Sequence, residues 1–149
     1  MKLRMRIEIE GWRAGDEERR EAASVPTDRL PGLTDGQRAV ARKLGISEER
    51  YSRSAYAGRL NQQRLLEKTR RFGSALEERL RARFRGAQIN LIRLVTIDHE
   101  YCIEISANGK RVPFRVSEDM VDEFIERGSA AAGETIERNL ETVLNVQAA

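Results

Sequence analysis

The sequence predicts an α+β fold in which an antiparallel sheet of three to four strands is covered on one face by helices. Residues 89–116 contain three short segments with alternating apolar side chains, separated by turn residues, which is typical of a β-meander. Residues 59–85 place apolar side chains at every third or fourth position, the period of a helix with one buried side. The 149 residues are enough for one domain with its own core and too few for two of ordinary size. We therefore expect a single domain over residues 1–149.

The first segment, residues 2–10, is the candidate fourth strand. Apolar and charged residues alternate along it, and the apolar set falls on one side of an extended chain: Leu3, Met5, Ile7 and Ile9. Residues 13–33 then lose all periodicity and contain Pro26 and Pro31. We interpret 13–33 as an internal linker, with room for a short helix around residues 15–23.

A helix is predicted to begin at Thr34. Thr34 and Gln37 have the spacing of a capping box, in which each side chain bonds a backbone N–H of the first turn. The helix is expected to end at Leu44, because Gly45 accepts the left-handed conformation common after helices. Ser47 is then placed to cap the next helix.

The segment 59–85 is predicted to be a long amphipathic helix. Its apolar stripe keeps its phase across Gly73, which favours one bent helix over two, and Gly86 ends it. A continuous helix of this length would span about 40 Å. The stripe consists of Leu65, Thr69, Phe72, Leu76, Leu80 and Phe84.

The meander is predicted as strands 89–97, 101–106 and 111–116. Asn108-Gly109 is a strong signal for a two-residue hairpin turn, because both residues tolerate positive φ. That turn fixes a register with every apolar pair on one face: Ile105 with Val112, Ile103 with Phe114, and Tyr101 with Val116. For the preceding turn we expect a two-residue loop at Asp98-His99, which would place Ile92 opposite Ile105 and Leu94 opposite Ile103.

Two more helices are predicted to follow the sheet. Ser117 is placed to cap the first, which Gly128 closes, and residues 134–146 form the second. Both carry apolar residues at helical spacing, and we expect them to pack on the apolar face of the meander.

Composition indicates an intracellular protein without a membrane span, and we expect it to be cytoplasmic. The single cysteine, Cys102, cannot form an internal disulfide, and no apolar run approaches the ~20 residues of a membrane helix. The net charge of +3 is unevenly distributed. Residues 34–86 carry 14 basic and 6 acidic residues, whereas residues 87–149 carry 6 basic and 11 acidic ones. This asymmetry makes a homo-oligomer one candidate state of the protein.

We predict no catalytic, metal-binding or cofactor-binding residues, and therefore no enzyme. His99 is the only histidine, and no second Cys or His is available to complete a tetrahedral metal site with it and Cys102. We interpret His99 as a turn residue and Cys102 as a small side chain on the outer face of the sheet. The acidic pairs at 118–119 and 122–123 are expected to lie on a solvated helix face.

The long helix supplies the predicted binding residues. Nine basic side chains lie along it against three glutamates, and two of the nine can pair at i,i+4 within the helix. We predict that this surface docks onto an acidic protein surface or nucleic acid, which requires that its charges find no counterion within the chain. The nine residues are Arg59, Arg64, Lys68, Arg70, Arg71, Arg79, Arg81, Arg83 and Arg85.

Residues 33–53 carry a short resemblance. Ala41, Gly45 and Tyr51 have the spacing of a bacterial helix-turn-helix, which the segment resembles and which implies DNA binding. The first turn of the second helix departs from that pattern, because Glu48 and Glu49 would repel phosphate. The same segment is similar to a short helical segment of phage prohead protease and scaffold proteins, which implies docking onto a protein and a phage or mobile-element relation. A third interpretation is two helices that simply pack at an angle.

Overall fold

The computed structural model describes residues 5–11 and 15–148. Its contacts divide the chain into two compact units. We call Met1–Gly11 with Leu65–Ala149 the sheet unit, and Trp12–Arg64 the helical unit. Helix α3 (Glu48–Arg83) is continuous and contributes to both.

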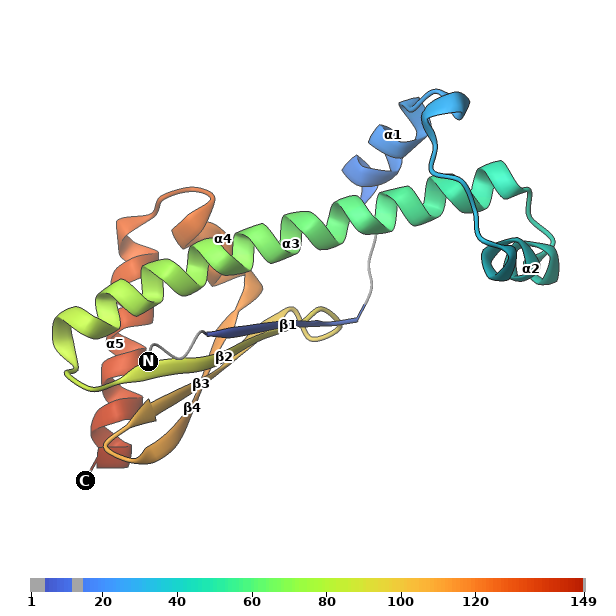
Figure 1. The fold of residues 1–149 in the computed structure, drawn as a ribbon. Helices are drawn as coiled ribbons and strands as arrows, with labels where there is room; N and C mark the ends of the chain where they lie inside the picture. Colours follow the sequence, from blue (N-terminus) through green and yellow to red (C-terminus); the bar gives the residue numbers. More distant parts are fainter. Residues whose placement is uncertain (1–4, 12–14, 149) are drawn as a thin grey trace. The chain divides into compact units, whose positions relative to one another are not determined.

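The sheet unit contains four strands in the order β1-β2-β3-β4 (Figure 1). They are β1 (Arg6–Glu10), β2 (Gln88–Val95), β3 (Glu100–Ala107) and β4 (Lys110–Ser117). The α+β class is confirmed, but the sheet is mixed and not antiparallel throughout, because β1 pairs parallel with β2. Alternation identified β1 as a strand without giving its direction. The long connection to β2, which includes α3, allows the parallel pairing that a tight hairpin cannot make.

The β3–β4 hairpin has the predicted register. Ile105 pairs with Val112 and Ile103 with Phe114, and the turn residues Asn108 and Gly109 have φ of 52° and 76°. The predicted β2–β3 register was wrong by two residues.

In the β2–β3 pair, Ile92 lies opposite Ile103 and Leu94 lies opposite Tyr101. The connecting turn is longer than the predicted two residues, and His99 N–H donates to the Thr96 carbonyl within it. From Leu91 to Val95 the shift is two residues, so Ile92 and Leu94 still face inward. A β-bulge between Ile89 and Leu91 then places Ile89 opposite Ile105, and Ile89 is buried as well.

The core lies on one face of the sheet, where three helices meet it. Helices α4 (Glu118–Ile125) and α5 (Ala130–Ala148) pack there with the C-terminal half of α3. The Ser117 side chain caps α4 as predicted, and Ser129 starts α5 earlier than expected. The core contains Leu65, Phe72, Leu76 and Leu80 from α3, Val121 from α4, Ile136, Leu140 and Leu144 from α5, and the inward residues of β2–β4.

Helix α3 passes Gly73 without a break. Gly73 is buried, and a Cβ added there would lie 2.6 Å from Cε of Met5 and 2.9 Å from Cδ1 of Ile92. The glycine therefore allows close approach between α3 and the sheet, and it does not end the helix.

The helical unit consists of α1 (Asp16–Ser24), a 3-10 turn (Thr27–Arg29), α2 (Asp35–Leu44) and the first half of α3. The segment interpreted as a linker, 13–33, thus contains the short helix α1. The capping box of Thr34 and Gln37 is formed, and Gly45 has φ of 69°. The second helix and the long helix, expected separately, are the single helix α3.

Candidate functional site

Most of the nine predicted binding residues are occupied by carboxylates of the same chain. Within the sheet unit, Arg79 contacts Glu137 at 2.6 Å, and Arg83 contacts Glu137 at 2.6 Å and Glu141 at 3.2 Å. Arg71 lies 3.8 Å from Glu126, Lys68 contacts Asp122 and Glu118, and Arg81 pairs with Glu77 one turn earlier. Within the helical unit, Arg64 contacts Glu18 at 2.9 Å and Glu21 at 2.5 Å.

Three of the nine, Arg59, Arg70 and Arg85, form no ion pair with the described residues. The requirement that the whole stripe finds no internal counterion is therefore not met. The net charge of residues 34–86 gave a wrong expectation, because the acidic helices α4 and α5 pack beside α3 and neutralise much of its positive charge. Arg79 is held further by stacking 4.9 Å above the ring of Phe124.

Lys68 belongs to a polar cluster in the sheet unit. Its ammonium lies 2.9 Å from Asp122 Oδ1 and 3.4 Å from Glu118 Oε1, while Glu118 Oε2 lies 3.1 Å from His99 Nδ1. Burial disfavours the ammonium, but the hydrogen bond to Asp122 and the neighbouring negative charges outweigh it and raise the pKa of Lys68. The cluster therefore holds a fixed cation between two carboxylates.

Glu118 corrects the expectation of a solvated helix face at 118–119. Its side chain is buried, with 7% exposed, and its partners tie α4 to α3 and to the turn before β3. His99 is a turn residue as predicted, with φ of 51°. The Tyr101 hydroxyl is buried beside the cluster and has no hydrogen-bond partner among the described residues.

The outer face of the sheet carries Cys102, as predicted. In register it lies between Arg93 of β2 and Arg115 of β4, and all three line a hollow of about 390 Å³. Both arginines are paired, Arg93 with Glu8 at 2.8 Å and Arg115 with Glu100 at 3.8 Å. The hydrogen bond from Arg93 keeps the pKa of Glu8 below its usual value. These cross-strand pairs make an ion-paired sheet face.

In the helical unit, Arg53 joins α1 to α3. Its guanidinium donates to the carbonyl oxygens of Ala22 (2.9 Å), Ala23 (3.2 Å) and Val25 (2.6 Å) at the end of α1. It also contacts Glu49 at 2.9 Å, and this hydrogen bond, with one from Thr27, lowers the pKa of Glu49. Arg53 thereby satisfies carbonyls that the end of a helix leaves open.

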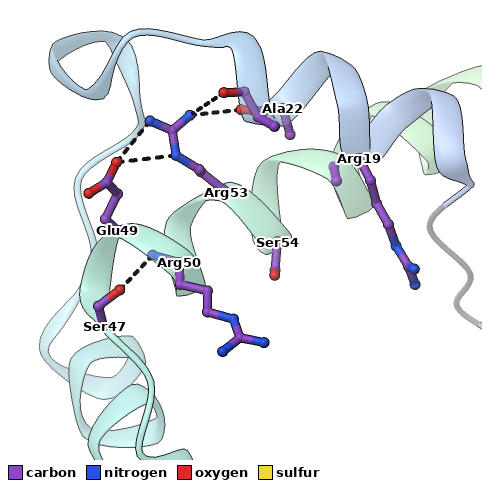
Figure 2. A pocket seen from close by; sticks show the side chains of 9 residues that line it. Arg19, Ala22, Ser47, Glu49, Arg50, Arg53 and Ser54 are labelled. Atoms are coloured by element: carbon purple, nitrogen blue, oxygen red, sulfur yellow. Dashed lines mark hydrogen bonds and ion pairs between the residues drawn. The ribbon is translucent and has the colours of Figure 1, made fainter.

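A hollow of about 280 Å³ lies beside this junction, between α1 and the start of α3. Arg19 of α1 and Arg50 of α3 extend to the same side of the helix pair, and Ser54 lies between them (Figure 2). Neither arginine has a side-chain partner among the described residues. The hollow is therefore cationic although Arg53 is occupied.

Helix α2 presents an apolar edge that the described residues leave open. Val40 is 43% exposed and Leu44 63%, and at i,i+4 they lie on one side of the helix. Arg42 and Lys43 occupy the same last turn, and neither is ion-paired within the described chain. Ala41 is the residue of α2 that is buried.

Sequence reasoning missed Glu118, Arg53 and the α1–α3 hollow. Glu118 has the same parity as Val112, Phe114 and Val116, so the alternation of β4 pointed it inward. Lys68 was predicted as a binding residue but not as a half-buried one; its place three residues after Leu65, at the border of the apolar stripe, is a weak sign of partial burial. Nothing in the sequence connects Arg53 to residues 22–25.

No described helix is both long enough and apolar enough to cross a membrane, and the described residues contain no group of three or more His, Cys, Asp or Glu arranged to hold a metal ion. No family model, curated protein or solved structure matches the chain.

Proposed function

We propose that this chain is a non-enzymatic docking protein, and that it binds an acidic surface of another protein through α2. The observation that carries the proposal is the open edge of α2, where Val40 and Leu44 lie exposed beside Arg42 and Lys43. Exposed apolar side chains surrounded by charge are typical of protein-binding surfaces.

The charge distribution supports the helical unit as the docking part. It has 11 Lys and Arg against 8 Asp and Glu, whereas the sheet unit has 16 of each. Seven of its cations have no ion pair with the described residues, against three of its carboxylates. The seven are Arg19, Arg20, Arg29, Arg42, Lys43, Arg50 and Arg59.

A protein partner fits this surface better than nucleic acid does. Phosphate backbones are bound mainly by cations and hydrogen-bond donors, so Val40 and Leu44 would gain little there. Against a protein, covering a Leu and a Val side chain adds about 1.5–3 kcal/mol each when burial is complete. Of the nine residues predicted from the sequence, the three that stay open do not belong to α2: Arg59 and Arg70 lie on α3, and Arg85 lies in the turn after it.

One observation favours DNA binding as a second candidate. The helix-turn-helix-like segment keeps its Gly45 turn, and the acids of the first turn of α3 are neutralised by Arg38, which is 3.5 Å from Glu48, and by Arg53. The repulsion of phosphate expected from the sequence is thereby reduced.

The test is crosslinking in the organism that makes the protein. A photoreactive amino acid replaces Leu44 in one sample and the exposed Val146 in another. We expect a discrete protein adduct from position 44 and none from position 146. Crosslinked nucleic acid would support the DNA-binding candidate, and the absence of any adduct at position 44 would contradict docking through α2.

Charge reversal separates this surface from the long helix. Arg42→Glu with Lys43→Glu should abolish the adduct, because an acidic partner would then be repelled. Arg70→Glu with Arg85→Glu makes the same change in charge on open cations of the sheet unit and should leave the adduct intact. If Arg70→Glu with Arg85→Glu abolished the adduct and Arg42→Glu with Lys43→Glu did not, the docking surface would be the predicted basic segment 59–85 and not α2.

A further inference from the structure

We propose that the hollow between α1 and α3 is a binding site for a phosphomonoester group. Arg19 and Arg50 supply its cations, and none of its lining residues belongs to α2, so the site is independent of the docking surface proposed above. Of the three arginines that line the hollow, Arg53 is bound within the fold, whereas Arg19 and Arg50 have no side-chain partner among the described residues.

Arg53 shows what a structural arginine does at this place. Its donors are directed at three carbonyl oxygens and at the carboxylate of Glu49. These hydrogen bonds within the junction of α1 and α3 leave Arg53 little capacity to bind a ligand. Arg19 and Arg50 line the same hollow and have no such acceptors among the described residues. A guanidinium presents its donors in a fixed planar fork suited to bidentate contacts with phosphate.

The balance of charge around the hollow matches a phosphomonoester. Three guanidinium groups and one carboxylate line it, which leaves two positive charges. The carboxylate is Glu49, whose pKa is lowered by hydrogen bonds from Arg53 and Thr27, so it remains ionised and committed to Arg53. A phosphomonoester carries about −1.5 to −2 near neutral pH, whereas a carboxylate or a phosphodiester carries one negative charge.

The arrangement of donors favours the same ligand. Arg19 comes from α1 and Arg50 from α3, and Ser54 lies between them on the side to which both extend (Figure 2). The three terminal oxygens of a phosphomonoester can accept hydrogen bonds from both guanidinium groups and from the Ser54 hydroxyl at once. A carboxylate has only two oxygens, which lie in one plane. The hollow, at about 280 Å³, has room for the phosphate and the first atoms that carry it.

The experiment is a titration followed by NMR on the side-chain Nε–Hε signals of arginine, above about pH 7, where the ligand carries close to two charges. The probes are inorganic phosphate and a phosphoserine peptide, and the comparison ligands are acetate, the unphosphorylated peptide and a short DNA duplex. We expect saturable shifts at Arg19 and Arg50 with the phosphate probes. Equal affinity for both phosphate probes assigns a free small ligand, and tighter binding of the phosphopeptide assigns a phosphorylated protein.

Matched variants complete the test. Arg19→Gln and Arg50→Gln should each weaken phosphate binding by about tenfold or more, the effect of losing a charged hydrogen-bonding partner. Arg59→Gln removes another open arginine of the same unit that does not line the hollow, and should leave binding unchanged. Similar shifts with acetate, equal losses in all three variants, or stronger binding of a DNA duplex than of the phosphopeptide would each overturn the proposal.

Discussion

At the scale of single residues, Arg53 has the densest set of contacts in the helical unit. Arg53→Ala would remove the donor that three carbonyls at the end of α1 share. We expect a loss of about 1–3 kcal/mol in the stability of this unit, since part-buried acceptors lose their partner. Hydrogen exchange of the α1 amides measures it.

The control for Arg53 is Arg59→Ala on the same helix. Arg59 has no ion pair among the described residues, so its removal should change stability by less than about 0.5 kcal/mol. Equal exchange in the two variants would mean that the carbonyls find water as readily as they find Arg53.

The buried Tyr101 hydroxyl forms no hydrogen bond within the part of the chain that the structure describes, so Tyr101→Phe should be neutral or stabilising. Burial raises the pKa of Tyr101, and the nearby Thr69 hydroxyl and Lys68 ammonium only partly oppose this. The unfolded tyrosine ionises from about pH 10 while the folded one ionises only at higher pH, so the protein loses folding stability as the pH rises above about 10. Urea denaturation between neutral pH and about pH 11 should show a smaller alkaline loss in Tyr101→Phe.

Tyr101→Phe should still lose some folding stability at high pH, because Lys68 also contributes to that loss. The pKa of Lys68 is also raised in the fold, so its contribution is complete below the unfolded value, about 10.4, and is lost as the pH rises through the folded value. Lys68→Met, in contrast, removes the ammonium that pairs with Asp122 and with the buried Glu118, and should destabilise already at neutral pH. Identical pH profiles for wild type and Tyr101→Phe would remove Tyr101 from this account.

At the scale of elements, Gly73 explains how α3 lies so near the sheet. Alanine is usually better than glycine inside a helix by about 1 kcal/mol. At this position the added Cβ would meet Met5 and Ile92, so we expect the cost of repacking, about 1–3 kcal/mol, to exceed that gain. Thermal or urea denaturation of Gly73→Ala should show a net loss, whereas Ser74→Ala on the exposed side should be nearly neutral.

A double-mutant cycle identifies the cause. Met5→Ala removes the side-chain end that the new methyl group would meet, so Gly73→Ala should cost less in that background. Additive effects of the two substitutions would mean that the contact with Met5 does not decide the outcome.

The elements also show which structural features sequence patterns determine. The Asn108-Gly109 turn fixed the β3–β4 register because its length and its positive φ values are local properties. The β2–β3 turn has no such pair, and between Leu91 and Val95 a shift by two residues keeps the apolar face intact, so alternation could not detect it. The direction of β1 depends on the connection through α3, which no pattern within residues 2–10 records.

At the scale of the whole molecule, the candidate sites follow from which charges neutralise one another. The basic segment 34–86 is divided between the two units, and its second part is matched by Glu137, Glu141 and Asp122. Counting charge along the chain cannot reveal this, because ion pairs join positions more than 50 residues apart. The open cations could therefore be located only once the partners of the others were known.

The two units should also differ in stability, because their cores differ in kind. Among the described residues, the buried apolar side chains of the helical unit are Ala22, Ala41 and Ala57, whereas the sheet unit buries Phe, Leu, Ile and Val side chains from six elements. Burial of a large apolar side chain contributes about 1.5–3 kcal/mol, and an alanine methyl contributes much less. Hydrogen exchange in increasing urea should show α1 and α2 losing protection before β2, β3 and α5 do.

Acid should widen that difference through Glu18. Burial alone would raise the pKa of Glu18, but the hydrogen bond from Arg64 and the nearby positive charge lower it overall. A lowered folded pKa gives stability that is present above the unfolded value, about 4.3, and is lost as the pH falls through the folded value. Glu18→Gln should therefore weaken protection of α1 at neutral pH and remove part of its acid sensitivity, while Glu78→Gln, at an exposed position of α3 in the sheet unit, should do neither. If both units instead lost protection at one urea concentration in every variant, the chain would unfold as a single cooperative body, and ion pairs such as Arg64–Glu18 would carry no separate stability.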